Sequence, residues 1–314
     1  MGLVSFPGIS SRLLPGSFDL HVAGISAEDC LTSAARREIA CLLDHAKPQP
    51  RQTFLLPTDY NIDPSEHSAL LTKILKLAPF LLPAEQKFHV PALRHPDLSL
   101  SNILLAPRST KIASIIDWQD AVAFPLFMQA GYPPFCEHDW SRTQSLKIPK
   151  LPKEYDSMST DDKVQAKIKF RLEESNLYYT AATGIHNKEH INALRIPHLG
   201  MCQYLIQQTG YPWDADVIIL RAALVGITTP NIWNHISPLQ PCPVSFSEEE
   251  RENAMSDSDA WNESEALLSR VRDNLGIDLE GGTDPDNFEW ASRRNLEFRT
   301  EFLRQAEVHE RELC

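Results

Sequence analysis

Two short stretches decide the fold of this chain. Residues 95–102 read HPDLSLSN, and residues 115–119 read IIDWQ. In the first stretch, His95, Asp97 and Asn102 have the spacing H-x-D-x-x-x-x-N. Acidic and amide side chains at fixed intervals next to apolar runs are typical of a site built at the end of a small sheet.

The residues between these stretches predict a β-hairpin. Residues 103–106 (ILLA) and 112–116 (IASII) are short apolar runs that favour two buried strands. Between them, residues 107–111 (PRSTK) have the composition of a turn. The two strands are therefore expected to pair with each other.

The register of this hairpin would bring the polar residues together. Pairing Ile103 with Ile116 places Asn102 opposite Asp117, at an α-carbon separation of about 4.5 to 5.5 Å. An amide oxygen and a carboxylate are hard donors that suit Mg²⁺ held jointly with phosphate oxygens. Asp97, in the preceding loop, could orient a hydroxyl and accept its proton during phosphoryl transfer.

Each of these residues also has a purely structural interpretation. Asp97 could be a turn residue, Asn102 the start of a strand and Asp117 the cap of a local loop. His95 could be a hydrogen-bonded core histidine. The combination of loop spacing, apolar hairpin and a second-strand Asp favours the chemical interpretation, because H-x-D-x-x-x-x-N is also the spacing of a kinase catalytic loop.

Helical patterns dominate the rest of the chain. Ser26 with Asp29 and Ser247 with Glu250 have capping-box spacing, which predicts helix starts. The expected helices cover about 27–46, 64–78 (stopped by Pro79 and Pro83), 159–185, 188–208 (broken at Pro197), 214–225, 247–275 and 285 onward. The expected fold class is α+β, mostly α.

Charge and composition exclude several classes of protein. The 314 residues carry a net charge of −12, and residues 245–314 hold 19 acids and eight arginines, which accounts for −11 of it. This acidity argues against a nucleic-acid binder. No apolar run reaches the roughly 20 residues of a membrane span. Six scattered cysteines without C-x-x-C spacing favour reduced thiols in an intracellular compartment.

The stretch 93–119 resembles the aminoglycoside phosphotransferase and choline-kinase-like family, which has a protein-kinase-like fold. The D-W-Q ending of residues 117–119 and the helix at 32–39 (TSAARREI) are similar to a fungal branch that includes the altered inheritance of mitochondria protein 9 group. The resemblance covers about residues 26–235. It implies phosphoryl transfer from ATP to a small-molecule hydroxyl as the ancestral activity, and a mitochondrial location in place of a cytoplasmic one.

Carried over by position, the resemblance implies a role for each motif residue. Asp97 would be the catalytic base and His95 would brace the loop. Asn102 and Asp117 would bind Mg²⁺ and, through it, ATP.

The sequence before His95 departs from a complete kinase. Its glycines form no G-x-G, and its lysines leave none on a predicted strand, so the chain is expected to be a C-terminal lobe without its N-terminal lobe. Independent activity is then doubtful, and a pseudokinase-type scaffold or a truncated gene product are alternatives. The uncovered apolar face predicts a protein partner. The expected division is an irregular segment 1–25, a lobe 26–235 and an acidic helical extension 236–314.

Overall fold

The computed structural model describes residues 26–51, 56, 61–136, 146, 148–213, 216–278 and 281–313. The segment 1–25, which we predicted to be irregular, lies outside the described residues, as does the predicted helix start at residue 214. Among the described residues, no helix is both long enough and apolar enough to cross a bilayer.

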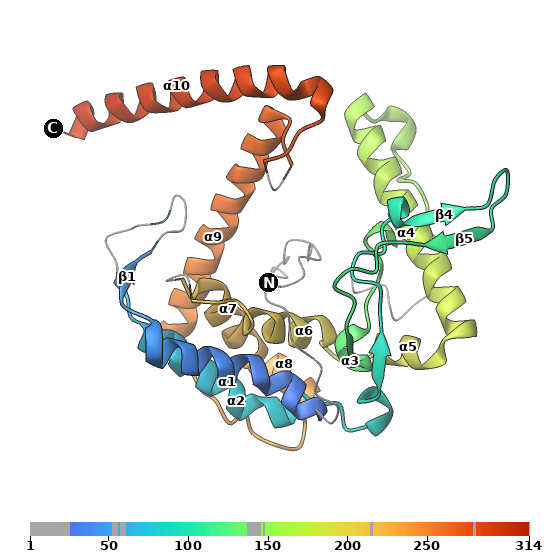
Figure 1. Cartoon of the computed structure of the whole chain (residues 1–314), viewed down its shortest axis with the longest axis vertical. Helices are drawn as coiled ribbons and strands as arrows, with labels where there is room; N and C mark the ends of the chain where they lie inside the picture. The colour runs from blue at the N-terminus through green and yellow to red at the C-terminus, as the bar shows by residue number, and fades with distance from the viewer. Residues whose placement is uncertain are drawn as a thin grey trace.

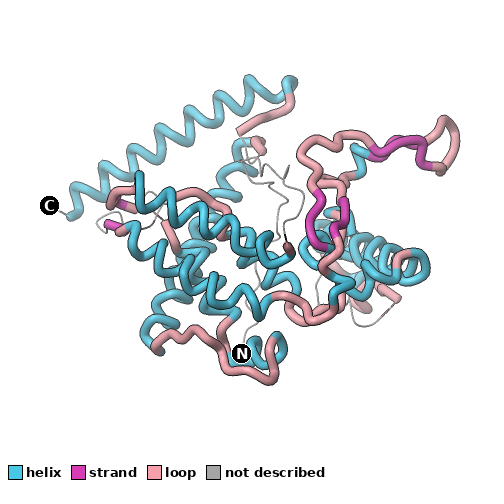
Figure 2. The backbone as a smooth tube through the Cα atoms, turned by 60° about the horizontal axis from the view of Figure 1, so that its bottom comes forward, coloured by secondary structure: helices cyan, strands magenta, loops and turns pink. Residues whose placement is uncertain are grey.

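Helices make up most of the described chain, as Figures 1 and 2 show. The α-helices are α1 (Ala27–His45), α2 (Pro64–Leu81), α3 (Leu126–Gln129), α4 (Thr160–His186), α5 (Lys188–Ala193), α6 (Leu199–Gln208), α7 (Ile218–Ile227), α8 (Pro230–Ile236), α9 (Glu248–Leu275) and α10 (Phe288–Leu313).

The strands form small antiparallel pairs, β1 with β2, β3 with β6 and β4 with β5. They are β1 (Gln49–Pro50), β2 (Asn61–Ile62), β3 (Pro91–Leu93), β4 (Ile103–Leu105), β5 (Ile112–Ile115) and β6 (Ala123–Pro125). A mostly helical α+β fold is therefore confirmed.

Local caps fix several helix starts where the sequence predicted them. The Ser26 hydroxyl accepts a hydrogen bond from the Asp29 backbone N–H at 3.1 Å, and the Asp29 carboxylate accepts one from the Ser26 N–H. The same reciprocal arrangement joins Ser247 and Glu250 at the start of α9. These caps satisfy backbone donors that the first helical turn leaves without partners.

Two prolines behave differently from each other. Pro197 lies between α5 and α6 and separates them, as predicted. Pro79 was predicted to stop α2, but the helix continues to Leu81. Because Pro79 lies in the last turn, it removes one backbone donor near the helix end without preventing that turn from packing on the core.

The core lies between the first two helices and the later helices α6 and α7. α1 and α2 lie side by side, and α2 contacts α7, which in turn packs against α6 and α8 (Figure 1). Leu31, Leu71, Ile74, Leu205 and Leu224 are fully buried there. Burial of such side chains stabilises the fold by about 1.5–3 kcal/mol each, before the entropy cost of ordering them.

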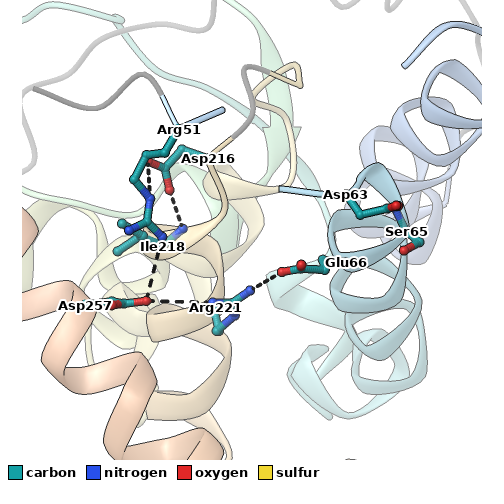
Figure 3. Close-up of polar contacts among 8 residues, drawn as sticks. All are labelled: Arg51, Asp63, Ser65, Glu66, Asp216, Ile218, Arg221 and Asp257. Carbon is teal, nitrogen blue, oxygen red and sulfur yellow. Dashed lines mark hydrogen bonds and ion pairs between the residues drawn. The ribbon is translucent and has the colours of Figure 1, made fainter. Parts of the chain in front are cut away.

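An ion-pair network joins α2, α7 and α9 beside this core (Figure 3). Arg221 Nη2 donates to Glu66 Oε2 at 2.9 Å, and Arg221 Nη1 lies 3.9 Å from Asp257 Oδ2. Arg51 Nη2 is also 3.9 Å from that Asp257 oxygen, and Arg51 Nε is 3.6 Å from Asp216 Oδ2. The network fixes how three helices meet.

α9 packs against α7 and then carries the chain away from the core to α10, which extends across one end of the molecule (Figure 1). Gly276 ends α9 in the left-handed conformation with φ 64°, as the sequence predicted for a helix-terminating glycine. The division into 26–235 and 236–314 stays a prediction, since α9 is in contact with α7 across that boundary.

Candidate functional site

The predicted hairpin exists, but its register differs by one residue from the predicted one. Ile103 pairs with Ile115 and Leu104 with Ser114. The pairing then shifts to Leu105 with Ile112, which leaves Ala113 as an extra residue in β5. The tighter turn is the physical reason for the difference. With the Ala106 N–H donating to the Lys111 carbonyl, the strands pair two residues earlier than predicted, and the extra residue Ala113 reduces that offset to one residue at Ile103.

The observed register moves Asp117 away from the position opposite Asn102. Instead, the Ile116 N–H donates to the Asn102 carbonyl at 3.0 Å, so these two residues end the ladder. At the other end the Ala106 N–H donates to the Lys111 carbonyl at 2.8 Å, which makes the turn tighter than predicted. Asp117 is the first residue beyond the paired segment.

The prediction that both strands are buried is wrong. Leu104, Leu105 and Ile112 are 45%, 55% and 60% exposed. The hairpin projects from the body of the molecule in both views (Figures 1 and 2). Its apolar side chains therefore form an exposed apolar face. That a missing N-terminal lobe would cover this face stays a prediction.

Arg94 anchors the start of the loop formed by residues 95–102, which carries Asp97. Its guanidinium donates to the Gln129 carbonyl at 3.0 Å and to the Tyr132 carbonyl at 2.8 Å. The guanidinium lies against the backbone of Gly131, and a Cβ there would overlap Arg94 Nη1. Only glycine at this position lets the arginine lie so close to the chain.

His95 connects the loop to the end of the hairpin. Its Nε2–H donates to the Ile116 carbonyl at 2.7 Å, because a carbonyl can only accept. The ring is 6% exposed and meets the Trp118 ring edge-on at a centroid distance of 4.7 Å. The Trp118 indole N–H in turn donates to the Ile115 carbonyl at 3.0 Å. These contacts tie the loop to the end of the hairpin, and the bracing role of His95 in catalysis stays a prediction.

Asn102 is held by the loop that carries Asp97. Its amide nitrogen donates to the Asp97 carbonyl at 2.9 Å and lies 3.4 Å from Asp97 Oδ2. Because a carbonyl requires a donor, the nitrogen must face Asp97 and the amide oxygen must point elsewhere. Among the described residues, nothing is hydrogen bonded to that oxygen, which leaves it available as a ligand.

Asp117 has an unusual backbone. Its φ is 65°, in the left-handed region that non-glycine residues adopt rarely and that Asp tolerates better than most. Its side chain is exposed and directly follows Ile116, the residue that His95 contacts. The loop bearing Asp97 and the residue before Asp117 are thus joined through His95.

The available donors have the chemistry of a magnesium site. Asn102 supplies an amide oxygen, and Asp97 and Asp117 supply exposed carboxylates, all of them hard oxygen donors. Among the described residues, no cluster of three or more His, Cys, Asp and Glu side chains could hold a metal ion. Any Mg²⁺ here would therefore take part of its coordination from water or phosphate oxygens, as is usual for this ion.

Two features of the site were not predicted from the sequence. One is the anchoring of Arg94 on residues 129–132, for which the sequence offers no periodic signal. The other is the left-handed backbone at Asp117 and at Asp120, where φ is 60°. The only available hint was that Asp is more common than most residues in that conformation.

Comparison with known proteins shows similarity to two groups. The chain is 65% identical over 315 aligned positions to subtelomeric hrmA-associated cluster proteins of two Aspergillus fumigatus strains. This alignment covers 99% of the chain and 62% of each relative, so the chain spans less than two thirds of their length.

A more distant similarity reaches altered inheritance of mitochondria protein 9, mitochondrial, of Vanderwaltozyma polyspora. Identity is 22% over 196 residues, which is 59% of this chain and 30% of that protein. The predicted relationship to that group is therefore confirmed as distant sequence similarity. No protein-family model matches the chain, and no solved structure matches it.

Proposed function

We propose that residues 95–117 form a Mg²⁺-nucleotide site of the kind that the aminoglycoside phosphotransferase-like family uses for phosphoryl transfer. The observation that carries this proposal is the 2.7 Å hydrogen bond from His95 to the Ile116 carbonyl. It joins the loop that holds Asp97 and Asn102 to the hairpin end that leads into Asp117. The distant similarity to altered inheritance of mitochondria protein 9 supports the proposal.

Each residue then has a role that follows from its position. Asn102 and Asp117 would hold Mg²⁺, whose charge neutralises phosphate oxygens when it is bound. Asp97 would orient the acceptor hydroxyl and take its proton. His95 is a positioning residue, since its ring contacts the backbone of residue 116 and the side chain of Trp118.

For this chain alone we propose nucleotide binding, with turnover depending on groups outside it. Catalysis of phosphoryl transfer rests on positioning and on charge stabilisation around the transferred group. The sequence before His95 contains no glycine-rich loop and no predicted strand lysine to supply these contacts. The acceptor, and a mitochondrial location, are proposals that rest on the resemblance.

Calorimetric titration with Mg-ATP tests the site. We expect Asp117→Asn to weaken binding at least about ten-fold, because it removes a carboxylate ligand while Asn still tolerates a left-handed backbone. Asp120→Asn is the matched control, since Asp120 is also an exposed Asp with positive φ, three residues further along.

Both variants remove one negative charge, so comparing them distinguishes loss of a metal ligand at Asp117 from a general change in charge. Wild-type binding that Asp120→Asn leaves intact and Asp117→Asn removes would support the proposal. Equal binding by both variants, or no binding by the wild-type chain, would reject it.

A second candidate function is a pseudokinase-type scaffold. The exposed apolar side chains of Leu104, Leu105 and Ile112 favour it, because such a face suits a protein partner. A stoichiometric partner that co-purifies with the wild-type chain and is lost from Leu105→Ser, without any effect of Mg-ATP, would favour this function over the first.

A further inference from the structure

The helix α10 is attached to the rest of the molecule mainly at its start. Its main contacts are with α9 and with the short 3₁₀ turn at Pro285–Asn287. Near that start, Ala291 is buried, and the Trp290 ring lies against Gly276, the residue that ends α9. From there the helix continues across one end of the molecule, away from the core (Figure 1). Its later turns therefore depend on some other surface to cover their apolar side chains.

These later turns present an apolar face. Leu296, Phe298, Phe302 and Leu303 are all exposed. Because successive residues of a helix are about 100° apart around its axis, these four side chains fall within one half of the helix surface. The rings of Phe298 and Phe302 stack on each other, with centroids 6.4 Å apart and planes inclined by 20°. An exposed apolar half of a helix is typical of a surface that packs on a partner.

The opposite half of the same turns is suited to water. There Arg294 Nη1 lies 3.4 Å from Glu297 Oε2, and Arg304 Nη2 donates to Glu301 Oε1 at 2.7 Å. These charges are paired within the helix, so this half needs no partner. A partner of α10 is therefore expected on the apolar half.

The four apolar side chains are arranged symmetrically along the helix. Leu296 with Leu303, and Phe298 with Phe302, are two pairs that share a midpoint at positions 299–300. A two-fold axis at this midpoint, perpendicular to the helix, would place Leu296 of one chain beside Leu303 of a second copy, and Phe298 beside Phe302. Since a two-fold interface brings the same patch of two subunits together, this face is complementary to itself.

The charges along α10 favour the same antiparallel arrangement. By sequence, residues 288–299 contain three Arg and two Glu, a net charge of +1, and residues 301–312 contain two Arg and four Glu, a net charge of −2. Two antiparallel copies would place the positive half of each helix beside the negative half of the other. An anionic lipid surface is disfavoured as the partner, because helices that bind it are rich in Lys and Arg.

We propose that α10 is a dimerisation helix, and that two copies of this chain pair antiparallel through the face formed by Leu296, Phe298, Phe302 and Leu303. This inference does not depend on the function proposed for residues 95–117. Arg299 lies between the two rows of apolar side chains and next to the axis, so the two copies of Arg299 would approach each other. Their like charges should limit the affinity of the dimer.

Sedimentation velocity over about a hundred-fold range of protein concentration tests the proposal, because dimers dissociate on dilution. The wild-type chain should change from monomer to dimer. Leu296→Glu should raise the dissociation constant at least about ten-fold, since each dimer loses two apolar contacts and gains two charges. Leu239→Glu is the matched control, because Leu239 is an exposed leucine between α8 and α9, and it should dimerise like the wild type.

Two results of this experiment would overturn the proposal. One is a wild-type chain that stays monomeric at every concentration, including one that binds vesicles of phosphatidylcholine and phosphatidylserine through this face. The other is the same effect of Leu296→Glu and Leu239→Glu on the dissociation constant.

Mixing chains of opposite charge at residue 299 tests the position of the axis. In Arg299→Glu, two glutamates would meet at the axis, whereas a mixed dimer with the wild-type chain would bring an arginine and a glutamate together. With equal amounts of both chains, one of them tagged, native mass spectrometry should therefore show more mixed dimer than the half expected for random pairing. A mixed fraction of half or less would contradict an axis at positions 299–300.

Discussion

The helical core and the β4–β5 hairpin show two ways in which this chain uses apolar residues. In the core, Leu71 and Ile74 are fully buried between helices. In the hairpin, Leu105 and Ile112 are more than half exposed, although the local sequence is equally apolar. Apolar runs therefore occur both in the helical core, which stabilises the fold, and in the exposed β4–β5 hairpin, which adjoins the candidate site.

The largest expected difference between these regions is in stability. Leu71→Ala should lower the free energy of unfolding by about 2–5 kcal/mol, because it removes a fully buried side chain and leaves a cavity. Leu105→Ala should change it by less than about 0.5 kcal/mol, since that side chain is 55% exposed.

Urea denaturation of both variants measures this difference. A hairpin variant as destabilised as the core variant would mean that the hairpin is covered in solution, and would contradict the contrast.

A buried histidine makes the core sensitive to acid. His67 lies in α2, is 4% exposed and stacks on Trp213 with centroids 5.7 Å apart. Burial lowers the pKa of His67 to about 4 from an ordinary 6.5. The unfolded chain therefore binds a proton that the folded chain resists, and stability falls as pH falls from about 6.5 towards 4.

The shift corresponds to about 3 kcal/mol between neutral pH and pH 4. Unfolding free energies measured from pH 7.5 to pH 4.5 should show this loss, with smaller losses from His190 and His198, whose pKa values burial also lowers. His67→Gln should reduce the slope. An unchanged slope in that variant would assign the acid sensitivity to other groups.

Loss of the Arg94 anchor on residues 129–132 should lower the free energy of unfolding less than loss of a buried core side chain. Gly131→Ala places a methyl group where the Arg94 guanidinium lies, so the arginine must give up its bonds to Gln129 and Tyr132. We expect a loss of about 1–2 kcal/mol in stability and weaker Mg-ATP binding, because the loop bearing Asp97 starts there.

Gly184→Ala is a suitable control, since no atom lies within 4 Å of a Cβ placed at that helical glycine. Measuring both properties in the two variants shows whether the Arg94 anchor matters to the site. If the two alanine variants have the same stability and the same affinity for Mg-ATP, the Arg94 anchor does not support the site.

The smallest expected effect concerns the hairpin surface. Leu104→Ser should leave the unfolding free energy within about 0.5 kcal/mol of the wild-type value. It should reduce binding of an apolar fluorescent dye, because Leu104 is part of the exposed apolar face. Unchanged dye fluorescence would place the dye-binding surface elsewhere, for example on α10, whose Phe288 and Trp290 are also exposed.

The sequence predicted those features that are set by neighbouring residues. Helix starts at Ser26, Asp63, Ser159 and Ser247 were predicted correctly because a cap depends on side chains two or three positions away. The break at Pro197 was predicted for the same reason.

Features set by distant contacts were harder to predict. The burial of the hairpin was predicted wrongly because apolar composition does not tell which element covers a strand. Its register depends on the bulge at Ala113 and on a tighter turn, neither of which has a clear signal in the sequence. The roles of His95, Asp97, Asn102 and Asp117 stay predictions, because the contacts of His95 with Ile116 and of Asn102 with Asp97 do not themselves test a chemical role.

Nuclear magnetic resonance with Mn²⁺-ATP tests the central claim most directly, because bound Mn²⁺ broadens signals near it. We predict selective broadening of the amide signals of residues 97–102 and 116–118, including the side-chain amide of Asn102, while α1 and α2 are unaffected. Broadening centred on the helical core, or uniform over the chain, would contradict a divalent-cation site where the loop meets the hairpin.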